Sequence, residues 1–201
     1  SNYPETLRSK KQLSLVSTPH ARMPEREMPE FMRKLAAAEG YAARVIELAI
    51  LTGVRSGEAR GALFSEFDLA AGEWLIPAER MKARKPHRVP LSRQSADLVR
   101  RMVADRDVRA CTEGLRHKNL EHLFPSATGR GTVSKAALPK AMSKLDSSCT
   151  IHGFRSTIRD WAEETARARH NTAEHILAHR GTDPTVNSYK RSSCFDERRE
   201  L

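Results

Sequence analysis

The sequence has few cysteines, few aromatic residues and no long apolar run, and each shortage excludes a class of protein. Its three cysteines, Cys111, Cys149 and Cys194, are odd in number and far apart, which argues against a disulfide framework and fits a reducing compartment. No apolar stretch approaches the roughly 20 residues that a membrane-spanning helix needs. The N-terminus has no signal-peptide pattern. We therefore expect a cytoplasmic protein with no membrane partner.

The charge of the chain is unbalanced toward the positive sign. It has 35 Lys and Arg residues against 25 Asp and Glu, a formal net charge of +10. Such a domain attracts polyanions, because contacts with phosphates release condensed counterions. A merely soluble basic protein is the alternative, but the charge favours nucleic-acid binding. Because aromatic residues make up only 5%, a base-stacking platform is disfavoured and duplex DNA is the expected partner.

Two further absences concern cofactors. The carboxylates are scattered and mostly adjacent to Lys or Arg, so no cluster has the spacing of Mg²⁺ ligands. Gly129-Arg130-Gly131 lacks the rest of a phosphate-binding P-loop. We expect neither a metal nor a nucleotide cofactor.

Hydrophobic periodicity predicts a mainly α domain with a small three-stranded antiparallel β-sheet. Residues 1–28, interrupted by prolines, are interpreted as a linker or arm, and residues 29–201 as one domain. Ser56 is expected to cap a short helix, and residues 111–133 to form a polar connection. The expected strands are 67–69, 73–77 and 87–91. The other expected helices are 29–40, a segment ending near 52–53, 93–109, 134–145, 153–168, 172–179 and 184–191.

Two short segments concentrate cationic side chains. Thr52-Gly53-Val54-Arg55-Ser56-Gly57-Glu58 places Arg55 where an apolar helix ends. His152 and Arg155 stand three residues apart at the start of another helix. Cleavage of a phosphodiester builds negative charge on phosphate oxygens, and the planar guanidinium of Arg is well suited to bind it. Either segment alone is a weak signal, since an isolated Arg is more often a surface residue.

Taken together, these segments resemble the tyrosine recombinase family over residues 29–195. That family has Thr-Gly-x-Arg-x-x-Glu, a lysine eight residues before a proline (here Pro90), His-x-x-Arg, Leu-Gly-His and, ten residues later, a tyrosine. This chain has Leu177-Ala178-His179, with an alanine in place of the glycine of Leu-Gly-His. The family's catalytic positions correspond, in order, to Arg55, Lys82, His152, Arg155, His179 and Tyr189. The resemblance implies a DNA breaking-rejoining catalytic fold.

The resemblance also implies a role for each position. Tyr189 would be the nucleophile and would form a 3′-phosphotyrosyl link. Because a free phenol has a pKa near 10, it needs a partner, and His152 is the expected acid or base. Arg55 and Arg155 would hold the non-bridging oxygens.

The remaining positions have supporting roles. Lys82 would protonate the departing 5′-oxygen, and His179 would donate a hydrogen bond to the phosphate. Glu58 is expected to orient Arg55 or His152 rather than to take part in the chemistry. The basic turn is expected to contact DNA through Arg84, Lys85 and Arg88.

The family resemblance implies a site-specific recombinase that integrates or excises a prophage or mobile element. The stretch from Met81 to Ser92 resembles P4-type prophage and genomic-island integrases. The family resemblance implies a bacterial, nucleoid-associated protein, a preceding DNA-clamping domain, a homotetramer on DNA and a monomeric isolated domain. It also implies a possible directionality factor.

Other interpretations stay open. Type IB topoisomerases use similar chemistry to relax supercoils, and a DNA-binding module could lack catalysis. A metal-dependent nuclease is a more distant alternative, for which His175 and His179, with His170 nearby, would be the candidate ligands. Tyr189 taken alone would be interpreted as a core residue.

Overall fold

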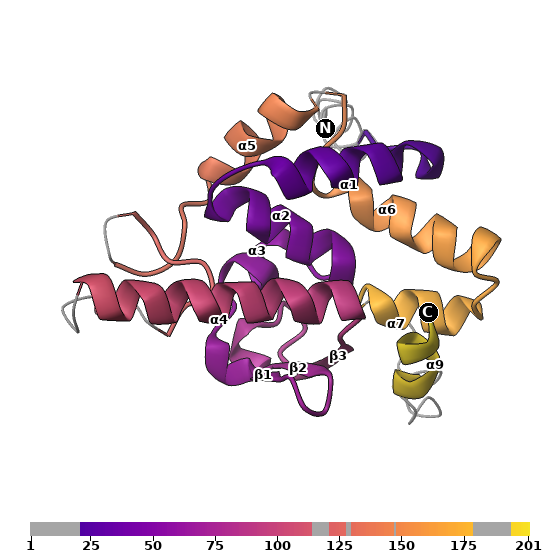
Figure 1. Cartoon of the computed structure of the whole chain (residues 1–201). Helices are drawn as coiled ribbons and strands as arrows, with labels where there is room; N and C mark the ends of the chain where they lie inside the picture. Colours follow the sequence, from indigo (N-terminus) through magenta and orange to yellow (C-terminus); the bar gives the residue numbers. More distant parts are fainter. Residues whose placement is uncertain (1–20, 114–120, 128–129, 147, 179–193) are drawn as a thin grey trace, which may run out of the picture.

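Helices make up most of the molecule, and the sheet is confined to one short segment (Figure 1). A computed structural model describes residues 21–113, 121–127, 130–146, 148–178 and 194–201. The α-helices are α1 (Met28–Ala37), α2 (Tyr41–Thr52), α3 (Ser56–Arg60), α4 (Arg93–Glu113), α5 (Ala137–Leu145), α6 (Gly153–Asp160), α7 (His170–Ile176) and α9 (Phe195–Glu200). The strands are β1 (Phe67–Asp68), β2 (Glu73–Ile76) and β3 (His87–Pro90). The remaining turns are the 3-10 turns η2 (Glu25–Glu27), η3 (Phe64–Glu66) and η4 (Ala78–Arg80), and the π-helical turn η5 (Trp161–Thr165). The predicted fold class is confirmed.

The three strands form an antiparallel sheet in the order β1-β2-β3. Trp74 pairs with Phe67 on one side and with Val89 on the other. Trp74 and its partner Val89 are buried, whereas Leu75, the next residue on β2, is 50% exposed. One face of the sheet therefore packs on the core and the other faces solvent, as is usual for small antiparallel sheets.

Helix α2 is the centre of the fold, because most of its residues are buried. Figure 1 shows it in the middle of the molecule, below α1 and above the sheet. On one side Val45 and Leu48 join a hydrophobic cluster that includes Trp74 and Phe124. On the other side Ile46 joins a second cluster with residues of α1, α5 and α6. This packing brings segments from both halves of the sequence around the C-terminal end of α2.

The ends of several helices differ from the expectation. Ser56 does not cap α3: the N-cap residue is Arg55, and Ser56 is the first helical residue. The cap hydrogen bond comes from Glu58, whose carboxylate accepts the backbone N–H of Arg55 at 2.8 Å. Helix α4 continues to Glu113. The segment 153–168 is divided into α6 and η5, and the helix expected at 184–191 lies outside the described residues.

Helix α5 begins at Ala137 rather than at Ser134. Ser134 is the turn residue before the helix, where its hydroxyl oxygen accepts the backbone N–H of Ala137 at 3.2 Å. Side-chain acceptors of this kind favour turns and helix starts over helix interiors. The predicted start at Ser134 is therefore three residues too early.

Candidate active site

Arg55 is fixed at the junction of α2 and α3 by a single carboxylate. One oxygen of Glu58 accepts the backbone N–H of Arg55 at 2.8 Å, and the other lies 3.1 Å from Nη1 of the same arginine. The Glu58 side chain is 5% exposed and that of Arg55 is 28% exposed. A buried carboxylate that binds both ends of a residue restricts its rotamers, so Arg55 presents its guanidinium to solvent in a defined direction.

Arg155, on α6, joins the ends of two other helices. Its Nη1 donates to the carbonyl of Gly53, just after α2, and its Nη2 donates to the carbonyl of Leu177, after α7, at 2.5 Å. The residue is buried, and burial together with the nearby charge of Arg55 lowers its pKa to about 10. It is therefore still a cation at neutral pH, and the carbonyl ends of two helices favour a cation there.

The turns that supply those carbonyls have unusual backbone conformations. Gly53 has φ +69°, and a Cβ there would lie 2.7 Å from Cγ2 of Ile176. Ala178 has φ +49°, a left-handed conformation that a glycine adopts without strain. The glycine of the family pattern thus has a physical reason, and this chain places an alanine in the strained position.

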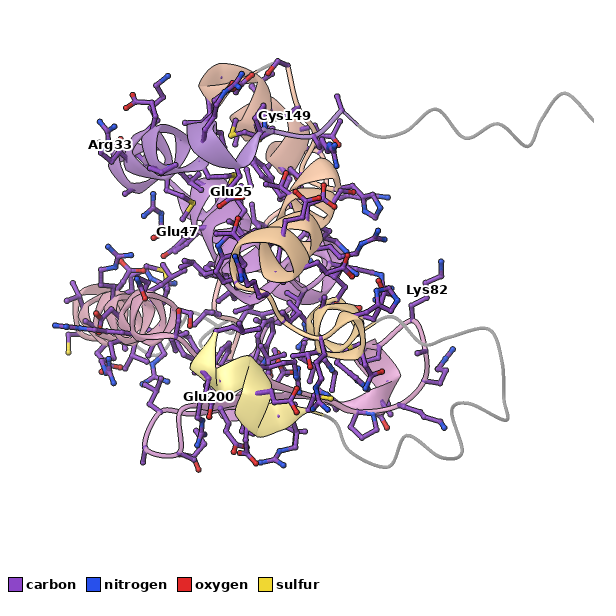
Figure 2. All side chains as sticks on the ribbon, turned by 90° about the vertical axis from the view of Figure 1, so that its right-hand side faces the viewer. Glu25, Arg33, Glu47, Lys82, Cys149 and Glu200 are labelled. Carbon is purple, nitrogen blue, oxygen red and sulfur yellow. The ribbon has the colours of Figure 1, made fainter. Side chains whose placement is uncertain are left out.

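The loop between β2 and β3 is attached to α3 by Arg80. Its guanidinium donates to the backbone carbonyl of Glu58 and to the carboxylate of Glu66, which also accepts the indole N–H of Trp74 at 3.0 Å. Lys82 follows two residues later and is exposed. Figure 2 shows its side chain projecting from the side of the molecule opposite α4. Arg80 therefore fixes the base of the loop and leaves Lys82 free to reach a ligand.

These elements enclose a cleft of about 640 Å³. Its cationic lining residues are Arg55, Arg80, Lys82, Arg84, Lys135 and Arg155. His152, the N-cap residue of α6, is exposed and also lines the cleft. Glu58 and Glu79 add two carboxylates to the lining of the cleft. The structure thus brings together Arg55, Lys82, His152 and Arg155, in an arrangement that fits a phosphate group.

The remaining predicted residues do not all join this cleft. His179 and Tyr189 lie outside the described residues. Lys85 is exposed but is not a lining residue. Arg88 points to the outer side of the sheet, where its Nη2 lies 2.6 Å from Glu73 and its guanidinium stacks 4.3 Å from the centre of the Phe195 ring. Arg88 is thus engaged with Glu73 and Phe195, and its expected contact with DNA stays a prediction.

Sequence reasoning missed Lys135, Arg80 and His87. His87 begins β3 and shares its inward face with Val89, which strand alternation could have indicated. Its Nε2 is buried, with no hydrogen-bond partner in the part of the chain that the structure describes. Burial first, and then the charges of Arg198, His175 and other residues, lower its pKa to about 3. His87 is therefore a neutral imidazole beside a cationic site.

One group within the described ranges has the geometry of metal ligands. The donor atoms of Glu163, His170 and Glu174 all lie within 4.8 Å of one another. They lie on η5 and α7 and are not lining residues of the cleft. The His175–His179 pair cannot be placed, because His179 is outside the described residues.

No helix in the described ranges is both long and apolar enough to cross a membrane.

The arrangement of the helices around the small sheet is similar to that of solved recombinases and integrases. Among solved structures the chain is similar to XerA recombinase, with a TM-score of 0.64, 16% identity and coverage of 88% of this chain and 60% of that one. It is also similar to the Tn1549 transposon integrase in complex with transposon right end DNA, with a TM-score of 0.62, 14% identity and coverage of 96% and 69%.

Sequence comparison gives the family. Residues 21–194 match the phage integrase family model, and the chain belongs to the phage integrase family. It is 32% identical to prophage integrase IntZ of Escherichia coli (strain K12), over 80% of this chain and 38% of that protein. It is 30% identical to the integrase of Enterobacteria phage P4, over 92% and 45%. The chain thus spans less than half the length of these two relatives.

Proposed function

We propose that this chain is the catalytic domain of a site-specific DNA recombinase that cuts and rejoins duplex DNA through a 3′-phosphotyrosyl intermediate on Tyr189. The observation that carries the proposal is the convergence of Arg55, Lys82, His152 and Arg155 on one cleft. The similarity to prophage integrases supports integration or excision of a prophage or mobile element as the biological role, with the bacterial nucleoid as its place of action.

The proposed reaction follows from the charges around the cleft. The phenol oxygen of Tyr189 attacks the phosphorus, and its proton passes to His152. The bond from phosphorus to the 5′-oxygen breaks, and Lys82 gives that oxygen a proton. Arg55 and Arg155 stabilise the negative charge that builds on the non-bridging oxygens, and His179 donates a further hydrogen bond to them.

Rejoining is the reverse of cleavage. A 5′-hydroxyl from a second strand attacks the phosphotyrosine, and Tyr189 leaves. Because one phosphodiester-like bond replaces another at each step, the exchange needs no nucleotide hydrolysis. Glu58 acts through Arg55, whose backbone and guanidinium it binds. Arg84 and Lys135, which line the same cleft, would contact the DNA backbone.

Duplex DNA is the partner that the reaction requires. Related recombinases have been solved bound to DNA, as in XerH with its difH substrate. That similarity supports duplex DNA as the partner of this chain. We also propose that four copies assemble on DNA and that a separate directionality factor acts with them, as the family resemblance implies.

A nicked suicide substrate tests the proposal directly. Loss of a short 5′-hydroxyl fragment by diffusion traps the covalent intermediate, which migrates as a protein–DNA adduct in a denaturing gel. The adduct should form in EDTA and be absent in Tyr189→Phe. An adduct that Tyr189→Phe still forms would contradict the assignment of the nucleophile, and activity lost in EDTA would favour a metal-dependent nuclease. Relaxation of a supercoiled plasmid by the monomer would favour a topoisomerase.

A further inference from the structure

The segment just before α1 lies along the helix that carries Arg155. Residues 21–25 make four interactions with this region: one with Thr150 just before α6, two with α6 and one with η5. The carbonyl of Ala21 accepts the N–H of Thr150 at 3.1 Å, and the carbonyl of Met23 accepts the hydroxyl of Thr157 at 2.6 Å. Arg22 forms an ion pair with Asp160, and Thr165 donates to Glu25 at 2.8 Å.

Two of these contacts lie on either side of the proposed catalytic pair. Thr150 comes two residues before His152, and Thr157 comes two residues after Arg155. Both hydrogen bonds use backbone carbonyls of residues 21–25, the part of the N-terminal segment that is called the arm below. A carbonyl fixed within its own chain is a more rigid partner than a long side chain, because it adds no rotamer freedom. The arm thus holds both ends of the segment 150–157.

The fit between the arm and the start of α6 is close. A Cβ on Gly153 would lie 2.1 Å from the carbonyl oxygen of Ala21, well inside any permitted contact. Met23 is 3% exposed and belongs to the same hydrophobic cluster as Phe154 and Phe31. The rings of Phe31 and Phe154 have their centroids 4.9 Å apart. Phe154 lies between His152 and Arg155 in the chain, so the arm packs behind the catalytic pair.

We propose that residues 21–23 are a positioning segment for the active site, which holds the start of α6 so that His152 and Arg155 face the cleft. This inference rests on the proposed function, since it assigns the segment to the same reaction. Neither Ala21 nor Met23 lines the cleft, so the segment acts through α6. A displacement of the arm, by DNA or by the residues before it, would change the position of both catalytic side chains.

The test is Thr157→Val, which removes the hydroxyl bound to Met23 and keeps the shape of the side chain. In single-turnover cleavage of the nicked substrate by the 201-residue chain, we expect the rate at saturating DNA to fall about tenfold or more, because catalysis is sensitive to displacements of about 1 Å. The half-saturating DNA concentration should stay within about twofold, since the variant removes none of the cations that line the cleft. Thr157→Ser keeps the hydroxyl and should restore the rate to within about twofold of the parent chain.

Thr165→Val is the matched control. It makes the same substitution and also removes a hydrogen bond to the arm, the one to Glu25, but on η5 rather than on the segment 150–157. It should cleave at the parent rate. The inference is overturned if Thr157→Val cleaves like the parent, if the two valine variants lose the same activity, or if Thr157→Ser restores nothing.

Hydrogen–deuterium exchange separates this inference from the proposed function. Thr157→Val should accelerate exchange of the backbone amides at 151–158, and Thr165→Val should not. If the parent chain forms no adduct, the proposed function fails, and the exchange result still decides whether the arm holds α6. Equal exchange in all three proteins would overturn the positioning role even if cleavage is observed.

Discussion

Gly53→Ala should destabilise the domain more than the same change at a left-handed glycine where a Cβ would meet open space. Gly53 has φ +69°, where a Cβ costs about 1–2 kcal/mol. The added methyl would also lie 2.7 Å from Cγ2 of Ile176, and overpacking of this kind costs about 1–3 kcal/mol. The expected loss in the free energy of unfolding is therefore about 2–5 kcal/mol.

Gly72→Ala is the control for the backbone contribution. Gly72 has φ +68°, nearly the same as Gly53, but nothing lies within 4 Å of a Cβ placed there. Only the conformational cost of about 1–2 kcal/mol should appear. The difference between the two variants therefore measures the contact with Ile176.

Urea denaturation followed by tryptophan fluorescence measures both variants, because Trp74 is fully buried in the native state. The slope of the free energy against urea should stay constant, so that a change of midpoint reports stability. Gly53→Ala should also slow DNA cleavage, because the Gly53 carbonyl holds Arg155. Equal losses of stability in Gly53→Ala and Gly72→Ala would refute the steric reasoning.

Three further predictions concern single side chains. Ala178→Gly should raise the free energy of unfolding by about 1 kcal/mol in the same urea assay, because it removes the strain of φ +49°; an unchanged midpoint would contradict this. Glu58→Gln should lower the rate of adduct formation about tenfold, since Arg55 loses a charge-assisted contact at 3.1 Å; a parental rate would show that Arg55 is held by other contacts. The pKa of His87 is lowered to about 3 in the folded state, below its unfolded value near 6.5. As the pH falls, the unfolded state therefore binds the proton first. The stability of the fold should decrease between about pH 6.5 and pH 3. Relative to His87→Gln, the parent should lose at most about 1.4 kcal/mol per pH unit in that range, and parallel curves would show that the imidazole is protonated in the fold.

Much of the fold followed from periodicity. The apolar faces of α1, α2 and α4 and the short alternating strands predicted a helical domain with a three-stranded sheet, and the structure confirms it. Helix ends were less predictable, as Arg55 shows. Serine is a common N-cap, but here the N-cap residue is Arg55, and the carboxylate of Glu58 accepts the backbone N–H of Arg55. Local preference decides that a helix starts nearby, while the competition between caps depends on which side chain the surrounding fold buries.

The residues of the cleft were visible in the sequence as types and spacings. Arg55 lies after an apolar helix, His152 and Arg155 lie at a helix start, and Lys82 lies in a basic turn. Their meeting in one cleft depends on α2, whose burial on both sides brings α3, α6 and the loop after β2 to its C-terminal end. Contacts over a hundred residues of sequence have no local signal, because they arise from tertiary packing.

By itself, then, the sequence determined the charge, the helical periodicity and the chemical types of the candidate site residues. The tertiary structure decided which basic residues face the cleft. Arg84 lines it, whereas Arg88 is paired with Glu73 on the outer side of the sheet. It also decided that Arg155 is buried between two backbone carbonyls and that the arm at residues 21–23 holds α6. The physical reason is that charge and periodicity belong to residues and short segments, whereas burial and the direction of a side chain depend on which other segments pack against it.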